Sequence, residues 1–255
     1  MPEEPSLSVH YMPQFVGEAD LAGATVVVID LLRASTTICT ALAAGATGVR
    51  PFLEVGEVVR AAEGLDRSQI VLGGERGGEI ISGFDLGNSP AEYTANVVFG
   101  RAVFFTTTNG TAALRHARLA KRVVVGALVN LSTVAESIAS DSEVHLLCAG
   151  TSGHVSREDR LAAGAIANKL LEIGGSRETS DAGQAVVGEW LELVAVARSG
   201  GRSIEQQLDR ELRETLGGKN LISIGMDDDL PRCAAIDTVG LVPIYDAGAG
   251  VIRVG

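Results

Sequence analysis

The chain contains 255 residues, of which 46% are hydrophobic, and it carries a formal net charge of −11 at pH 7. A chain of this length and composition buries a sizeable core, which excludes a largely disordered protein. The negative charge argues against a nucleic acid or an anionic membrane as the partner. Local arginines and backbone amides can still bind a small acidic ligand, so bulk charge does not decide the chemistry.

The sequence shows no pattern typical of export, membrane insertion or zinc binding. No apolar run approaches the ~20 residues that cross a bilayer, and the acidic N-terminal segment does not resemble a signal peptide. The three cysteines form no CxxC motif, and the four histidines form no HxH or HExxH motif. We therefore expect a cytoplasmic protein with reduced thiols, no membrane partner and no zinc site.

Strand-like and helix-like segments alternate along the chain. Residues 25–30 are mostly β-branched and predict a buried strand, after which Ser35 or Thr36 can cap a helix over 36–44. The next expected elements are a helix at 54–62, a strand at 70–72, a glycine-rich loop over 73–90 and a helix over 91–99 that follows Pro90. They are followed by strands at 102–106, 122–126 and 143–148, which alternate with helices at 111–118 and 131–140. Further helices are expected over 159–173, from Asp181 onward and over 203–216, the last ended by Gly217 and Gly218, and the chain ends with strands at 241–245 and 251–254.

This alternation predicts an α/β fold, layered α/β/α around a mainly parallel or mixed sheet with right-handed crossovers. No linker or break in composition divides the chain, so we expect a single domain that spans residues 1–255. The strand–loop–helix units at 26–44 and 103–118 resemble each other, which suggests an internal duplication.

Four of the expected strands end in polar and glycine residues, directly after Ile29, Leu72, Phe105 and Leu147. Because the carboxyl ends of parallel strands gather at one edge of an open sheet, we expect these endings to form one crevice. Glycines let backbone amides approach an anion, and a helix N-terminus adds partial positive charge. The pattern predicts a single site for an oxyanion such as a phosphate.

The first ending carries Asp30 and Arg33. The Arg33 guanidinium can bind a phosphate or sulfonate in a bidentate manner, and Ser35 and Thr36 offer hydroxyls and amides at a helix start. The alternatives are a loop-bonding role for Asp30, an Asp30–Arg33 ion pair, and helix capping by the two hydroxyls.

The next two endings add acidic, basic and amide side chains. Glu75 and Arg76 lie within a G-G-E-R-G-G sequence, and Asn88 and Asn109 can orient a substrate oxygen or a water. A plain turn is the alternative for the glycine-rich segment, and an Asx-turn is the alternative for either asparagine. The segment matches neither a Walker A loop nor a dinucleotide-binding motif.

The fourth ending carries Cys148, whose thiolate can accept a phosphoryl group. A phosphatase C-x5-R motif fails because His154 stands at the arginine position, and a D-x-D motif beginning at Asp30 fails because Leu32 follows. A buried core position is the stronger interpretation for Cys148.

Glu158 and Asp159 open an expected helix, where acidic side chains also favour the helix dipole. Together with Asp30, Glu75 and Asp85 they supply oxygen ligands of the kind that Mg²⁺ prefers. The run Asp227-Asp228-Asp229 is interpreted instead as a solvated loop and helix cap.

These motifs together resemble the family of 2-phosphosulfolactate phosphatases, the ComB-type enzymes of coenzyme M biosynthesis. The resemblance covers nearly the whole chain, and its several blocks in order are more specific than any one of them. The blocks are V-V-I-D-L-L-R-A-S-T-T at 27–37, G-G-E-R-G-G at 73–78, G-F-D-L-G-N-S-P-A-E-Y at 83–93, T-T-N-G-T at 107–111, C-A-G-T-S-G at 148–153, E-D-x-x-x-A-G at 158–164 and D-L-P-R-C-A-A-I-D at 229–237.

The resemblance implies a ComB-like α/β fold, unrelated to the dehalogenase and alkaline phosphatase folds. It implies Mg²⁺-dependent hydrolysis of a small anionic phosphorylated substrate, a phosphate monoester on a three-carbon sulfonated acid, to sulfolactate and phosphate. A homo-oligomer, such as a dimer, is expected at the level of the family. Membership does not fix the substrate, so a phosphatase for another small phosphorylated acid and a non-catalytic anion-binding protein stay as alternatives.

A mechanism follows as a hypothesis. Asp30 with one or more of Glu75, Glu158 and Asp159 would hold Mg²⁺ at the phosphate, and a metal-held water is the expected nucleophile, with attack by Asp30 or Cys148 left open. The other candidate residues would bind the substrate or orient the groups around it; they are Arg33, Ser35, Thr36, Arg76, Asn88, Asn109, Gly110, Thr111, Gly150 and Thr151.

Overall fold

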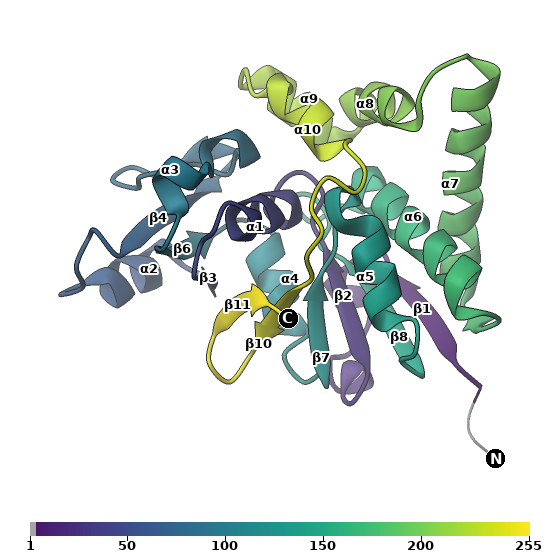
Figure 1. The fold of residues 1–255 in the computed structure, drawn as a ribbon, viewed down its shortest axis with the longest axis horizontal. Helices are drawn as coiled ribbons and strands as arrows, with labels where there is room; N and C mark the ends of the chain where they lie inside the picture. Colours follow the sequence, from purple (N-terminus) through teal and green to yellow (C-terminus); the bar gives the residue numbers. More distant parts are fainter. Residues whose placement is uncertain (1–3) are drawn as a thin grey trace.

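The computed structural model describes residues 4–255, and its elements agree with the expected alternation of strands and helices (Figure 1). The strands are β1 (Ser6–His10), β2 (Thr25–Ile29), β3 (Gly48–Phe52), β4 (Ile70–Arg76), β5 (Glu79–Ile80), β6 (Ala102–Thr106), β7 (Arg122–Val125), β8 (Glu143–Cys148), β9 (Glu178–Thr179), β10 (Pro243–Asp246) and β11 (Val251–Val254). The α-helices are α1 (Ala34–Ala43), α2 (Val55–Ala62), α3 (Ala95–Val98), α4 (Gly110–His116), α5 (Leu131–Ile138), α6 (Arg157–Gly174), α7 (Asp181–Ser199), α8 (Ile204–Glu214), α9 (Leu216–Ser223) and α10 (Leu230–Cys233). The short 3-10 helices are η1 (Pro13–Phe15), η2 (Glu18–Leu21), η3 (Pro90–Glu92), η4 (Leu128–Asn130) and η5 (Asp227–Asp229).

An eleven-stranded mixed sheet has the order β5-β4-β6-β3-β11-β10-β7-β2-β8-β1-β9. Strands β4, β6 and β3 pair in parallel, and so do β7, β2, β8, β1 and β9. The C-terminal hairpin β10–β11 lies between these two blocks and pairs antiparallel with both. Because three antiparallel pairings separate the two parallel blocks, the strands of one block run opposite to those of the other. The strand ends that were predicted to share one edge of the sheet therefore come from two oppositely directed blocks.

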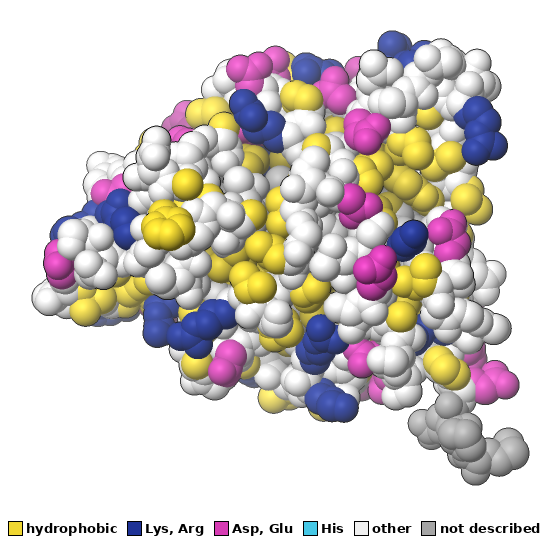
Figure 2. All heavy atoms as spheres, viewed as in Figure 1, with side chains coloured by type: hydrophobic (Ala, Val, Ile, Leu, Met, Phe, Trp, Pro, Cys, Tyr) yellow, Lys and Arg dark blue, Asp and Glu magenta, His cyan; other side chains and the backbone are white. Residues whose placement is uncertain are grey.

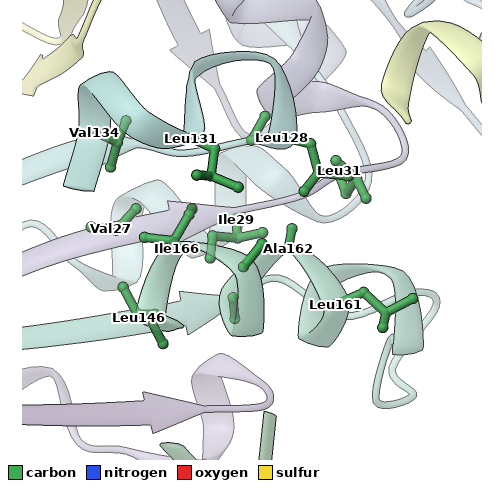
Figure 3. Packing of buried hydrophobic residues seen from close by; sticks show 14 of the residues in the cluster. Val27, Ile29, Leu31, Leu128, Leu131, Val134, Leu146, Leu161, Ala162 and Ile166 are labelled. Atoms are coloured by element: carbon green, nitrogen blue, oxygen red, sulfur yellow. The ribbon is translucent and has the colours of Figure 1, made fainter. Parts of the chain in front are cut away.

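Helices cover both faces of the sheet, which gives the predicted layered α/β/α arrangement. Along β2 the apolar side chains alternate between two hydrophobic clusters, as the period of two in a strand requires. Val27 and Ile29 pack with α5 and α6, through residues such as Leu131 and Ile166 (Figure 3). Val26 and Val28 pack on the opposite face, with apolar residues of α1 and α4. All five residues of β2 are buried, which explains its nearly continuous β-branched sequence.

Helices α8, α9 and α10 lie close together at the top of Figure 1. Helix α8 packs against α7, α9 and α10, and both α9 and α10 contact η5. The chain then returns from α10 through an extended segment to the hairpin β10–β11 at the middle of the sheet. Before this return, Asp229 at the end of η5 contacts Arg33 in the loop after β2, 196 positions away in the sequence.

Several predicted elements differ from the structure. The glycine-rich loop expected after residue 72 is in part a strand, because β4 continues through Glu75 and Arg76 and turns into β5 at Gly77 and Gly78, both with positive φ. The predicted helix over 91–99 is the shorter pair η3 and α3. Strands β1, β3, β5 and β9 were not predicted.

The predicted role of Gly217 and Gly218 as the end of a helix is wrong. Helix α8 ends earlier, at Glu214, and both glycines lie in the first turn of α9. A Cβ on Gly218 would lie 1.8 Å from the Leu212 carbonyl oxygen, so the glycine permits close packing of the two helices rather than ending one.

None of the helices in residues 4–255 combines the length and apolar character that a bilayer crossing demands. On the face drawn in Figure 2, Lys and Arg side chains are interspersed with Asp and Glu side chains. This face of the described residues therefore offers no continuous basic stripe of the kind that follows a nucleic-acid backbone. The two units that suggested an internal duplication are both present, as β2–α1 and β6–α4. The duplication itself and the single domain over residues 1–255 stay predictions.

Candidate active site

A cavity of about 350 Å³ lies where the carboxyl ends of β2, β4, β6 and β8 meet α9. Its lining combines charged, amide, hydroxyl and glycine groups from segments far apart in the sequence. These residues are Asp30, Leu32, Arg33, Glu75, Gly77, Gly78, Asn88, Thr108, Asn109, Thr151, Ser152, Gly217, Asn220, Leu221, Ser223 and Ile224. The predicted crevice is therefore present, although the strands that form it come from two oppositely directed blocks.

A larger and more open groove of about 920 Å³ lies elsewhere, between α2, α4 and the β10–β11 turn. Of the predicted site residues only Thr111 lines it, and Asp30, Glu75, Glu158 and Asp159 do not. Because Asp30, Arg33 and Glu75 line the smaller cavity and none of them lines the larger groove, we place the candidate active site at the smaller cavity.

Asp30 is held at the meeting point of two helix N-termini. Its backbone N–H donates to the Ser35 hydroxyl at 2.9 Å, and its carboxylate accepts from the amides of Ala34 and Gly110, which open α1 and α4. A Cβ on Gly110 would lie 2.7 Å from Asp30 Oδ2 and 2.8 Å from the Ala34 Cβ. Gly110 therefore acts by allowing this close approach, since any side chain there would displace the carboxylate.

The electrostatic surroundings of Asp30 oppose its ionisation. Burial, as the largest cause, and the negative charges of Glu75 and Glu158 together raise the pKa of Asp30 to about 7, although the amides of Ala34 and Gly110 act in the opposite direction. Such a carboxyl group needs either a proton or a nearby cation near neutral pH.

Glu75 connects the β4–β5 turn to the loop after β6. Its Oε1 accepts from the Thr108 amide at 2.7 Å, and its Oε2 accepts from the Gly78 amide at 2.7 Å. Arg76 points away from the cavity and donates to the Leu53 carbonyl and to the Thr106 hydroxyl. The alternation of side chains along β4 explains why these neighbours face opposite ways, which a loop assignment could not predict.

Glu158 and Asp159 lie side by side but have different surroundings. Asp159 accepts from the Leu31 amide with Oδ1 at 2.8 Å and from the Gly150 amide with Oδ2 at 3.0 Å, so it clamps the loops after β2 and β8. Glu158 accepts from the Thr151 hydroxyl with Oε1, whereas its buried Oε2 has no hydrogen-bond partner among the described residues. Ser156, not either acid, caps the helix with its side chain.

Arg33 pairs with Asp229 rather than with Asp30. The Arg33 Nη1 lies 2.7 Å from Asp229 Oδ2, and both side chains are almost completely buried. The interpretation of residues 227–229 as a solvated loop is therefore wrong for Asp229, and the alternative Asp30–Arg33 ion pair is not formed. Sequence spacing gave no signal for a pair that is 196 residues apart.

Other predicted residues fall into two groups. Asn88, Asn109 and Thr151 line the cavity, and Gly150 with φ of 78° shapes the loop beside it. Ser35 and Thr36 are buried, and their hydroxyls are used within the β2–α1 loop, because Ser35 binds the Asp30 amide and Thr36 donates to the Leu31 carbonyl. Neither caps α1, whose N-cap is Arg33.

Cys148 lies in the core and does not line the cavity. Burial raises its pKa well above the usual value, and the charge of Asp159 adds to this. These surroundings oppose a thiolate and favour the buried role. Asp85 is also outside the site, because its carboxylate pairs with Arg67 and accepts from the Leu72 amide.

Some of the oxygen atoms around the cavity are suited to bind a hard divalent cation. The charges of Glu75 and Glu158 both act on Asp30, and two buried oxygens, Glu158 Oε2 and Asn88 Oδ1, have no partner among the described residues. A cation would satisfy such oxygens and relieve the repulsion between the carboxylates. Among residues 4–255, however, no group of three or more His, Cys, Asp and Glu side chains is assembled to hold a metal ion. The fit is thus to Mg²⁺ that keeps several waters and takes few carboxylates.

Comparison with known proteins identifies close relatives. The model of the 2-phosphosulpholactate phosphatase family matches residues 10–248. A probable 2-phosphosulfolactate phosphatase from Symbiobacterium thermophilum is 41% identical over 91% of this chain and 96% of its own length. Proteins of the same name from Gloeobacter violaceus and Caldanaerobacter subterraneus are 38% and 37% identical, over 98% and 89% of this chain and 98% and 90% of their own lengths.

Proposed function

The chain belongs to the 2-phosphosulpholactate phosphatase family, and from this and the cavity we propose that it hydrolyses 2-phosphosulfolactate to sulfolactate and phosphate with the help of Mg²⁺. The observation that carries the proposal is the convergence of Asp30, Glu75 and Arg33 on one cavity, with Glu158 beside them. A phosphoric monoester hydrolase needs this combination of phosphate-binding and acidic groups.

The balance of charge in the cavity supports a cation-assisted reaction. Arg33 is the one basic side chain among the described lining residues, and Asp229 already neutralises it, whereas Asp30 and Glu75 are both acidic. A substrate with phosphate, carboxylate and sulfonate groups adds several negative charges, which this lining alone would repel. Mg²⁺, when bound, would supply the positive charge that neutralises the phosphate oxygens. Asp30 and Glu158, with the Asn88 amide oxygen, are the side chains that would hold it.

The protein groups then have separate tasks. Arg33 orients the phosphate, since a guanidinium donates charge-assisted hydrogen bonds to an oxyanion. Asn109, Asn220 and Ser223 offer neutral donors to the sulfonate and carboxylate. Asp30, fixed by the amides of Ala34 and Gly110, takes the proton of the attacking water. Direct attack of the Asp30 carboxylate on phosphorus is the alternative.

The substrate is tested by measuring phosphate release from a panel of esters, each with Mg²⁺ and with excess EDTA. We expect kcat/KM for 2-phosphosulfolactate to exceed that for 2-phospholactate, which lacks the sulfonate, by about 10²-fold or more, because donors placed for the sulfonate would be left unpaired. Loss of activity in EDTA that Mg²⁺ restores supports the cation. Preference for the ester without a sulfonate would instead favour a phosphatase for another small phosphorylated acid.

The nucleophile is tested by the stereochemical course at phosphorus, with a phosphate ester made chiral by oxygen isotopes. Inversion supports direct attack by water, whereas retention identifies a covalent intermediate, because two successive displacements restore the configuration. The place of the reaction in coenzyme M biosynthesis, a cytoplasmic location and a homo-oligomer such as a dimer stay predictions.

A further inference from the structure

Asp229 is an acidic residue that the proposed reaction does not use, yet its side chain is almost completely buried beside the cavity. Its Oδ2 accepts from Arg33 Nη1 at 2.7 Å, and its Oδ1 accepts from the Ser89 hydroxyl at 2.6 Å. The three residues come from the loop after β2, the loop before η3 and the end of η5, so Asp229 joins segments separated by 196 and 140 positions in the sequence.

The contacts of Arg33 show what this arrangement does to the guanidinium. Asp229 holds Nη1, and the Gly78 carbonyl accepts from Nη2 at 2.9 Å. Two partners fix the plane of the group, and its other N–H groups stay available toward the cavity that Arg33 lines. An arginine without such partners would lose rotamer freedom on binding an anion, and its buried charge would be uncompensated.

We infer that Asp229 is a positioning residue that orients Arg33 for the phosphate, an inference that rests on the proposed function. Preorganised donors stabilise developing charge without reorganisation, and a small misplacement of such a group is costly. Asp229 does not reach the lining of the cavity, so its effect on the reaction passes through Arg33. The bond to Ser89 fixes the carboxylate itself and ties the neighbouring Asn88 to the same unit.

The test compares Asp229→Asn, Ser89→Ala and the matched control Asp228→Asn, each alone and combined with Arg33→Ala. Asp228 is the adjacent acid of η5 and is exposed. Two quantities are measured with Mg²⁺ present: kcat/KM for phosphate release, and the Kd of inorganic phosphate by calorimetry. Melting temperatures report folding of each variant.

We expect Asp229→Asn to lower kcat/KM by about 10- to 100-fold, as removal of a group that orients an active-site partner commonly does. Its phosphate Kd should rise by about 10-fold, because the aligned guanidinium contributes to anion binding. Ser89→Ala should lower kcat/KM and raise the phosphate Kd by about 2- to 5-fold, since the ion pair between Asp229 and Arg33 is kept. Asp228→Asn should change neither quantity.

The double variants separate positioning from a structural role. In the Arg33→Ala background, Asp229→Asn and Ser89→Ala should cause no further loss, whereas structural damage would add to that of Arg33→Ala. Additive losses, or an unchanged Kd and kcat/KM in Asp229→Asn, overturn the inference. If Asp229→Asn does not fold, additive losses of Ser89→Ala and Arg33→Ala overturn the inference in its place.

The two quantities also distinguish this inference from the proposed function. A wild-type protein that binds phosphate but hydrolyses no ester refutes the function, while the Kd series still decides the role of Asp229. Hydrolysis without the expected coupling between Asp229 and Arg33 refutes the inference alone. A wild-type protein that neither binds phosphate nor releases it refutes both.

Discussion

The units β2–α1 and β6–α4 have the same local architecture and bring their helix N-termini to one point, but they contribute different chemistry. The loop after β2 carries Asp30 and Arg33, whereas the loop after β6 carries threonines, Asn109 and Gly110. Both helices donate an N-terminal amide to the Asp30 carboxylate. A shared geometry therefore supports charged groups on one side and neutral donors on the other.

The difference shows how the site limits the electrostatic repulsion between its charged side chains. A second acid or arginine at the β6 ending would face Asp30 directly, because Gly110 already lies against that carboxylate. Glu75, which also contacts the β6 loop, has both carboxylate oxygens bonded to amides or hydroxyls. Under the proposed function, the β2 ending would act on the phosphate, while the β6 ending would set the shape of the cavity and offer neutral donors to the substrate.

Among substitutions in the two units, replacement of Asp30 should lower turnover the most. We expect Asp30→Asn to lower kcat by about 10³-fold or more, because the group that handles the proton is lost. Asn109→Ala, in the loop of the other unit, should cost only about 10-fold, the value of a neutral donor to the substrate. Steady-state phosphate release measures both, and circular dichroism checks the fold. Near-normal Mg²⁺-dependent activity in Asp30→Asn would show that the assignment is wrong.

A methyl group on Gly110 should disturb the contact between the two units. Gly110→Ala places a Cβ within 2.8 Å of Asp30 Oδ2 and the Ala34 Cβ, and we expect about 10²-fold lower kcat with a loss of about 1–3 kcal/mol in unfolding free energy. Gly188→Ala is the control, because a Cβ there meets nothing within 4 Å in α7 and should be neutral or stabilising. Urea unfolding and kinetics measure both variants. Equal changes in kcat and in unfolding free energy for the two variants would contradict the steric role of Gly110.

The sequence was sufficient where a local pattern decides the structure. The apolar run before Asp30 and the glycine–threonine sequence around Gly110 predicted the two units within a few residues. The acids after β2, β4 and β8 were expected in one crevice, and the structure brings Asp30, Glu75 and Glu158 together. The parallel pairing of β2 with β8 imposes convergence of their ends, whereas β4 comes from the oppositely directed block, so parallel pairing alone does not explain the place of Glu75.

The sequence was insufficient where a distant partner decides. Asp229 stands in a run of three acids that is typical of a solvated surface, and only its pairing with Arg33 explains its burial. Gly217 follows the pattern of a helix end, but a Cβ there would lie 2.1 Å from Glu158 Oε1, so its role is to let α9 approach the site. No periodicity or spacing encodes contacts between segments that meet only after folding.

The pH dependence of stability should distinguish the charged unit from the neutral one. The pKa of Asp30 is raised to about 7 from its ordinary value of 3.8, so the folded state binds the proton more tightly than the unfolded state does. Stability from this group is therefore greatest below pH 4 and is lost as pH rises through about 7. In EDTA, Asp30→Asn should raise the melting temperature more at pH 8 than at pH 5, and Asn109→Ala should show no such dependence. A melting-temperature difference between Asp30→Asn and the wild type that stays constant with pH would contradict the shift.

The smallest effect is expected at Cys148, which follows the same strand pattern but faces the core. Cys148→Ala should change kcat by less than about 2-fold and cost about 1 kcal/mol of stability, because a buried thiol acts as a small apolar group. Cys148→Ser should be less stable than Cys148→Ala, since its hydroxyl would be buried in the apolar cluster of Leu161 and Ala162. Kinetics and thermal unfolding test the pair together. A large loss of kcat in Cys148→Ser with an unchanged melting temperature would restore the thiol as a participant, because packing alone would affect stability first.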